Sequence, residues 1–274
     1  MIGQKQLLNT VHKQLEEGKF PRFAIFIGPK GSGKKTLLKQ EFDGYYPEDN
    51  SVDSVRQIIA NSYKVSDSTF IFPDADDMST AAKNALLKVV EECPNGNRYI
   101  MTLQDSNNTL ETIMSRAITY YMDRYTPQEI EQYYTENYTA ADELIAIVRN
   151  LCDVPGEVDK LVAMGVSQFY DYVELVVDNI AEVSGSNAFK IANKVALKDE
   201  PDKYDLVLFF KAFIKICVDR FTDGADSVEK YAKAVQITSD YLRSVLKVKG
   251  INKEYIMNSW ILDIRGEWLC YARD

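Results

Sequence analysis

Short apolar runs alternate with helix-like segments in the first part of the chain. Residues 4–17 place hydrophobic side chains at helical spacing. Further along, runs of β-forming residues recur between polar stretches that have a helical pattern. Near-continuous apolar strands that alternate with helices predict a parallel sheet covered on both faces. The expected strands are residues 23–27, 69–72, 98–103 and 118–122.

The strand pattern stops after Tyr125, and a helical pattern follows to the end of the chain. Thr126-Pro127-Gln128-Glu129 has the pattern of a capping box with proline at the first helical position, which predicts that a helix begins there. Residues 204–221 are too apolar for a surface helix, so we expect them to pack on several sides. The apolar stripes of residues 228–248 and 253–271 fit either a core or a helix–helix interface with another chain.

Composition narrows the class of protein. The 274 residues are 46% hydrophobic and 27% charged, which is typical of a soluble globular protein with two or three domains. A net charge of -9 disfavours a large basic face for nucleic acid. Four scattered cysteines form no Cys-x-x-Cys pair, so neither a zinc knuckle nor a disulfide framework is expected. The first residues lack the apolar core of a secretion signal, and we expect a cytoplasmic protein.

The strongest chemical motif is Gly28-Pro29-Lys30-Gly31-Ser32-Gly33-Lys34, which fits G-x-x-x-x-G-K between an expected strand and an expected helix. Glycines let backbone N–H groups turn inward and cradle phosphates, and the helix N-terminus favours negative charge. The lysine would reach the β and γ phosphates of a nucleotide. The expected nucleotide-binding residues are Gly28, Gly31, Gly33, Lys34 and Thr36.

The residue after Lys34 departs from this motif. Phosphate-loop enzymes place Ser or Thr there to ligate magnesium, whereas this chain has Lys35, and Thr36 comes one position later. The sequence therefore favours nucleotide binding over a well-formed magnesium site. The expected cofactor is ATP or ADP, held weakly or vestigially.

Several blocks in order along the chain resemble the AAA+ clamp-loader subunits. The most specific match directly follows the expected strand at 69–72, and further matching blocks lie on both sides of it in the sequence. The matching blocks are SVDSVRQI (51–58), DADDMS (74–79), NALLKVVEE (84–92), LETIMSR (110–116) and VPGE (154–157). The resemblance implies an α/β nucleotide-binding-like AAA+ domain with a parallel sheet at 1–125, an all-α lid at 126–183 and an all-α collar for oligomerisation at 184–274.

The departures from the family pattern indicate a subunit that does not hydrolyse ATP. In the resemblance Pro73 stands at the magnesium aspartate position and Asp74 at the catalytic glutamate position, so Pro73, Asp74 and Asp76 form a degenerate Walker B motif. No arginine follows Gly156, where the motor subunits carry one. The family's zinc-binding cysteine cluster is missing, so no zinc is expected. Asp74 and Asp76 equally fit solvated residues at a strand-to-helix turn, with Asp76 or Ser79 capping the helix.

Arg116 is the expected catalytic residue. The resemblance implies an arginine finger that reaches the γ-phosphate of ATP on a neighbouring subunit; a surface salt bridge is the plainer alternative. Arg56, Lys83 and Lys88 lie on helices that line the DNA-holding ring in the family, or on a solvated helix face.

Three functions remain open. The pattern most resembles the delta-prime subunit of bacterial DNA polymerase III, which completes a neighbour's site without hydrolysing ATP itself. An active AAA+ clamp-loader motor and an unrelated phosphate-loop enzyme are the alternatives. The resemblance implies motor and delta-type subunits as partners, and the sliding clamp and primer-template DNA indirectly.

Overall fold

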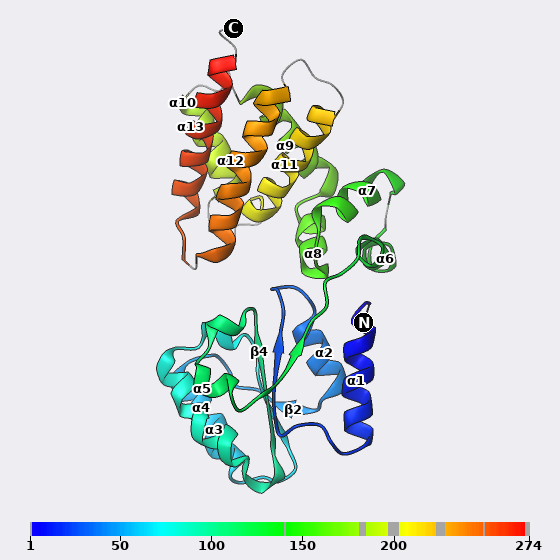
Figure 1. The fold of residues 1–274 in the computed structure, drawn as a ribbon, viewed down its shortest axis with the longest axis vertical. Coiled ribbons are helices and arrows are strands. Elements are labelled where there is room, and N and C mark those ends of the chain that lie inside the picture. The colour runs from blue at the N-terminus through cyan, green and yellow to red at the C-terminus, as the bar shows by residue number, and fades with distance from the viewer. Residues whose placement is uncertain are drawn as a thin grey trace. The chain divides into compact units, whose positions relative to one another are not determined.

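The computed structural model describes residues 2–139, 141–180, 185–196, 203–222, 228–248 and 250–271. It divides into two compact units (Figure 1). The first comprises residues 1–129 with the short segment 154–156, and the second comprises residues 130–153 and 157–274. The three-domain division with boundaries near 125 and 184 stays a prediction, and its second boundary falls on residues 181–184, outside the described residues.

The first unit is built on a five-stranded sheet in the order β2-β3-β4-β1-β5, and every described pairing is parallel. The predicted parallel sheet is therefore confirmed. Three strands begin and end where the apolar runs predicted, and the fourth ends one residue earlier, at Tyr121. The sequence did not predict the two-residue edge strand β2. The strands are β1 (Phe23–Ile27), β2 (Gly44–Tyr45), β3 (Thr69–Phe72), β4 (Arg98–Leu103) and β5 (Ile118–Tyr121).

Helices cover both faces of this sheet, as Figure 1 shows, with α1 and α2 on one side and α3, α4 and α5 on the other. The helix predicted at residues 4–17 is α1. Three short 3-10 turns, η1 (Ala75–Asp77), η2 (Pro94–Gly96) and η3 (Ser106–Asn108), connect the elements. The helices are α1 (Lys5–Glu16), α2 (Lys34–Glu41), α3 (Val52–Ser62), α4 (Thr80–Glu92) and α5 (Glu111–Met114).

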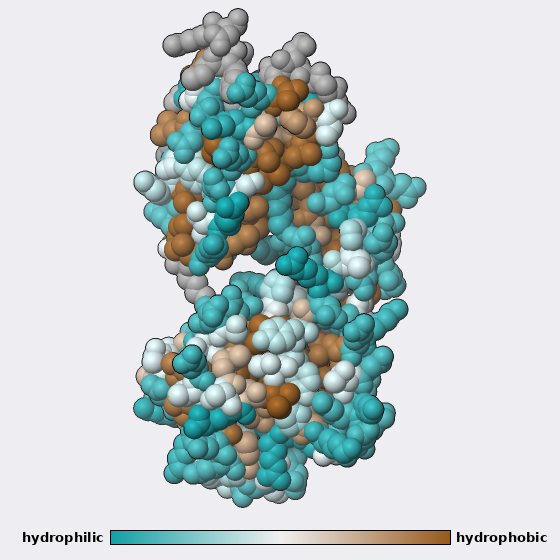
Figure 2. All heavy atoms as spheres, in the orientation of Figure 1, coloured by the Kyte–Doolittle hydropathy of each residue, from teal (hydrophilic) through white to brown (hydrophobic). Residues whose placement is uncertain are grey.

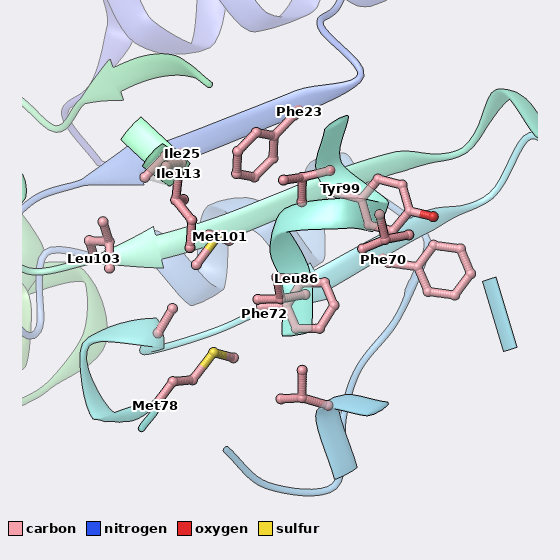
Figure 3. Packing of buried hydrophobic residues seen from close by; sticks show 14 of the residues in the cluster. Phe23, Ile25, Phe70, Phe72, Met78, Leu86, Tyr99, Met101, Leu103 and Ile113 are labelled. Carbon is pink, nitrogen blue, oxygen red and sulfur yellow. The ribbon is translucent and has the colours of Figure 1, made fainter. Parts of the chain in front are cut away.

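Two hydrophobic cores result, because successive strand residues point to opposite faces. Phe23 and Ile25 of β1 join Phe70, Phe72, Tyr99 and Met101 under α4, where Leu86 and Ile113 complete the packing (Figure 3). Ala24 and Phe26 face the other way, toward Leu7, Val11, Leu37 and Leu38 of α1 and α2. Burial on both faces explains why these strands lack polar alternation.

The second unit is helical, and α11 lies at its centre. Phe209, Phe210 and Phe213 are fully buried and pack against the ring of Trp260 on α13. This confirms the expected packing of residues 204–221 on several sides. The helices are α6 (Pro127–Asn137), α7 (Asp142–Leu151), α8 (Pro155–Ala163), α9 (Val166–Asn179), α10 (Gly185–Ala196), α11 (Leu206–Thr222), α12 (Val228–Lys247) and α13 (Lys253–Tyr271).

The predicted capping box starts α6. The Thr126 N–H donates to Glu129 Oε2 at 2.8 Å, and the Glu129 N–H donates to Thr126 Oγ1 at 3.2 Å. Each side chain therefore satisfies one otherwise unpaired backbone donor of the first turn. In the described part of the chain, no helix is both long and apolar enough to cross a membrane.

Candidate functional site

The glycine loop follows β1 and enters α2, as the motif requires. Gly31 and Gly33 have φ angles of 84° and 89°, a left-handed conformation that glycine adopts without steric cost. The Gly28 N–H donates to the Leu103 carbonyl at 3.1 Å, which ties the loop to β4. A Cβ atom at Gly28 would lie 2.7 Å from Cβ of Met122, so no other residue fits there without movement. The loop backbone is thus held in the form of a phosphate cradle.

Lys34 is the first residue of α2 and is only 5% exposed. Its Nζ donates to the carbonyl oxygens of Gly28 and Pro29 at 2.6 and 2.8 Å. Burial lowers the pKa of this ammonium from 10.5 to about 8, while the charges of Asp74 and Asp76 act in the opposite direction. A phosphate that replaced the two carbonyls would meet a lysine held at the centre of the loop.

Lys35 pairs with the predicted Walker B residue Asp74. Lys35 Nζ lies 2.5 Å from Asp74 Oδ2. Asp74 comes two residues after the end of β3 and has a left-handed φ of 50°. Its N–H donates to Thr102 Oγ1 at 2.8 Å, and its carbonyl accepts from Asn50 Nδ2 at 3.1 Å. The carboxylate is therefore anchored at the same end of the sheet as the glycine loop.

Asp76 has a different role from Asp74. It is 6% exposed, and its two carboxylate oxygens accept hydrogen bonds from the Gln104 N–H and from Asn108 Nδ2, both at 2.8 Å. These bonds hold the segment after β4 against η1. Ser79, not Asp76, caps α4, because its Oγ accepts from the Ala82 N–H at 3.2 Å. Pro73 lies half-buried between strand and turn and offers no side-chain ligand.

The remaining loop contacts involve residues distant in sequence. The hydroxyl of Tyr125 donates to the Ser32 carbonyl at 2.8 Å. The Gly156 N–H donates to the Gly31 carbonyl at 3.0 Å. Ser32 Oγ is buried without a hydrogen-bond partner among the described residues. Thr36 is exposed on α2, one position after the lysine pair.

Sequence reasoning missed Thr102, Gln104, Asn108 and Asn50. Thr102 is the next-to-last residue of β4, after three apolar residues, and the carboxyl ends of parallel strands meet at one edge of a sheet. A lone polar residue at the end of β4 was the available signal. Asn50 and Asn108 carry no such signal, because Asn50 lies in an irregular polar segment and Asn108 in the short polar turn η3.

The residues of this site fit a nucleotide's phosphates and do not fit a magnesium ion. Left-handed glycines, the buried Lys34 and the N-terminus of α2 are suited to phosphate oxygens. Magnesium requires oxygen ligands; Pro73, at the usual aspartate position, offers none, and an ammonium lies 2.5 Å from the neighbouring carboxylate of Asp74. Among the described residues no group of three or more His, Cys, Asp and Glu side chains is arranged to hold a metal ion.

Arg116 lies after α5 and just before β5. Its Nη1 donates to the Thr112 carbonyl at 2.8 Å, and its Nη2 lies 3.5 Å from Glu91 Oε1 on α4. β5 pairs with β1 so that Ile118 is opposite Ala24. Arg116 thus lies where the strands begin, whereas the glycine loop lies where β1 ends. At about 3.3 Å per residue, roughly 20 Å of strand direction separates Arg116 from Gly28.

The three basic residues considered for DNA differ in exposure. Lys83 is 8% exposed and its Nζ donates to the Asn108 carbonyl at 2.5 Å, so it supports the η3 turn instead of facing solvent. Arg56 and Lys88 are exposed on α3 and α4. The expectation of a solvated lysine on α4 is therefore wrong for Lys83.

Residues 48–126 match the family model described as "DNA polymerase III, delta subunit". Replication factor C subunit 3 of Saccharomyces cerevisiae is 26% identical over 155 residues, covering 48% of this chain and 44% of that protein. DNA polymerase III subunit tau of Bacillus subtilis is 26% identical over 170 residues, covering 47% of this chain and 30% of that protein. The matches thus span less than half the length of these relatives.

One solved structure extends the similarity in fold. The RuvB Holliday junction branch migration motor of Thermotoga maritima aligns with a TM-score of 0.50 at 14% identity, covering 99% of this chain and 88% of that one. This likeness concerns the fold alone. The parallel sheet, its flanking helices and the helical second part agree with the predicted AAA+ architecture. The sequence similarities, one to a family model over residues 48–126 and the others over just under half of the chain, are to subunits of replication factor C and DNA polymerase III.

Proposed function

We propose that this chain is a clamp-loader subunit of the delta-prime type in a cytoplasmic DNA polymerase III complex. It does not hydrolyse ATP by itself. Its role is to complete the ATP site of a neighbouring motor subunit with Arg116 and to hold the ring through its helical second part. This subunit acts on the sliding clamp and on primer-template DNA indirectly, as part of the assembled complex.

The altered magnesium site supports the absence of autonomous hydrolysis. Phosphate-loop ATPases hold magnesium with a Ser or Thr hydroxyl and a strand-end aspartate, and a further polar residue orients the attacking water. Here Lys35 replaces the hydroxyl, and Pro73 has no ligand atom. Asp74, the remaining carboxylate, is paired with Lys35 at 2.5 Å. These groups lack the ligands that would bring metal and water to a γ-phosphate.

The position of Arg116 carries the proposal that it acts in trans. Its guanidinium lies where the strands begin, roughly 20 Å from the glycine loop along the strand direction, which is more than an arginine side chain spans. It is 37% exposed and therefore accessible to another protein. A guanidinium that stabilises the charge on a transferring phosphoryl group is worth roughly 10³–10⁵ in rate in phosphate-loop enzymes.

An unpartnered stripe on α13 supports assembly through the second unit. Tyr255, Leu262 and Leu269 repeat every seven residues, and their side chains are 70%, 65% and 41% exposed. Residues seven apart lie on the same side of a helix, so these three side chains form one exposed apolar stripe along α13. Figure 2 shows hydrophobic surface over the part of this unit that α12 and α13 form. We infer that a helix of a partner subunit covers the stripe.

The decisive experiment measures ATP turnover by the reconstituted complex. Arg116→Ala should lower DNA-stimulated turnover while the complex still assembles, because a half-exposed ion pair contributes little to stability. Arg116→Lys should restore only part of the rate, since lysine lacks the planar fork that binds phosphate. Glu91→Gln is the matched control: it breaks the same ion pair and leaves the guanidinium in place. Equal turnover with and without Arg116 would overturn the proposal.

A further inference from the structure

Lys35 and Asp74 form a fixed pair at the mouth of the glycine loop. Lys35 is the second residue of α2, and Asp74 begins the turn after β3. Backbone hydrogen bonds to Thr102 and Asn50 set the position of Asp74 from two further elements. The carboxylate therefore has a defined place near the phosphate cradle, and the ammonium is held beside it at 2.5 Å.

In magnesium-dependent phosphate loops, the position after the loop lysine and the strand-end carboxylate hold the metal ion together. In this chain Lys35 occupies the first of these positions, Pro73 occupies the second, and the Lys35 ammonium pairs with Asp74, the residue after Pro73. A divalent ion beside Asp74 would have to displace the ammonium or bear its repulsion across a few ångströms. The ammonium supplies positive charge where the metal would supply it, and it carries three N–H donors, of which Asp74 uses one.

The rest of the loop retains the features that bind phosphate. The buried Lys34 directs its Nζ to the carbonyls that line the loop. Ser32 Oγ, in the same loop, is buried and has no hydrogen-bond partner among the described residues. The charges of Asp74, Asp76 and Lys35 all act on Lys34, so the two ammonium groups lie near each other beside the N-terminus of α2. This excess of donors matches a ligand with several anionic oxygens.

We propose that the loop binds a nucleoside diphosphate or triphosphate without a metal ion, with the Lys35 ammonium bridging Asp74 and the phosphates in place of magnesium. This inference rests on the proposed role as a subunit that does not hydrolyse ATP, and it assigns that subunit a structural nucleotide. The bound nucleotide would not be hydrolysed, because the site lacks both magnesium and a free carboxylate to orient the attacking water.

The test is titration calorimetry of the full chain with ADP, either with magnesium or with excess EDTA. The wild-type affinity should agree within about twofold under the two conditions. Lys35→Thr, which restores the usual hydroxyl, should weaken metal-free binding by about tenfold or more, because it removes a charge-assisted hydrogen bond to phosphate, and should make binding depend on magnesium. Lys39→Thr is the matched control, since it removes an exposed lysine from the same helix.

Three outcomes would overturn the inference: no measurable ADP binding, an affinity that magnesium raises tenfold in the wild type, or equal losses in the Lys35 and Lys39 variants. A fourth outcome, inorganic pyrophosphate that binds as tightly as ADP, would show that the nucleoside adds nothing to the affinity and would overturn the choice of a nucleotide as ligand. If metal-free ADP binding is not found, the proposed role of Arg116 is unaffected, because that role is tested by ATP turnover of the assembled complex. Phosphate release by the chain alone would instead refute the proposed function.

Discussion

The Gly156 N–H donates to the Gly31 carbonyl at 3.0 Å, and the two glycines pack backbone against backbone. Gly156 is the second residue of α8, and Gly31 lies at the centre of the glycine loop. A Cβ atom at Gly156 would lie 2.7 Å from Gly31 Cα, closer than real contacts allow. The start of α8 therefore defines one wall of the loop, at a position where only glycine fits.

Gly156→Ala should destabilise the chain by about 1–3 kcal/mol, because the added methyl group meets backbone that cannot rotate away. Denaturant unfolding measures the change. Gly266→Ala on α13 is the control, since a Cβ there meets nothing within 4 Å and alanine favours a helix. Equal stability of the two variants would show that the glycine contact is dispensable.

Lys34 should make stability depend on pH in the alkaline range. Burial lowers its pKa from 10.5 to about 8 in the folded chain, so between these values the unfolded chain binds more protons than the folded chain. Stability therefore rises with pH across this window. The free energy of unfolding of the wild type, minus that of Lys34→Met, should increase from about pH 8 upward. A difference that stays constant would contradict the lowered pKa.

Nucleotide binding should show the opposite pH dependence. A phosphate beside Lys34 stabilises the charged ammonium and raises its pKa, so ADP binding near pH 8 should take up a proton and weaken as pH increases further. Calorimetry in two buffers with different ionisation enthalpies measures this uptake. The same experiment on Lys34→Met should show no linked proton at this pH.

Lys211 stabilises the second unit through two carboxylates. Its Nζ lies 2.8 Å from Glu157 Oε1 and 2.5 Å from Asp153 Oδ2, and its side chain is 17% exposed. Lys211→Met should cost about 1–3 kcal/mol, because it leaves the half-buried Glu157 carboxylate without its cationic partner. Arg149→Met, which removes an exposed pair with Glu131, should cost less than about 1 kcal/mol. Thermal unfolding of both variants decides whether burial makes this difference.

Leu262→Glu should prevent assembly with partner subunits and leave the fold intact. The side chain is 65% exposed on α13, in the stripe with Tyr255 and Leu269, so a charge there is solvated in the free chain and buried in a complex. Size-exclusion chromatography with the partner subunits measures assembly. Leu175→Glu on α9, where the leucine is 60% exposed outside this stripe, is the control. Normal assembly of the Leu262 variant would place the interface elsewhere.

The local pattern of residues determined most of the elements. β1, β3 and β4 begin and end at the predicted residues because a strand buried on both faces is apolar along its whole length. Thr126 and Glu129 marked the start of α6, since a capping box is a contact between residues three apart. The strand β2 was missed because two residues, Gly44 and Tyr45, are too few to show periodicity.

Only the tertiary structure decided how the site residues combine. The motifs located Lys34 and Asp74 separately. The pairing of Lys35 with Asp74 depends on bringing α2, which follows β1, and the end of β3 to the same edge of the sheet, although β4 lies between β1 and β3. Thr102 hydrogen-bonds to Asp74, which is 28 residues away in the sequence, and Asn108 hydrogen-bonds to Asp76, which is 32 residues away. Such contacts leave no periodic trace, because the sheet order that creates them is set by packing across the whole unit and not by neighbouring residues.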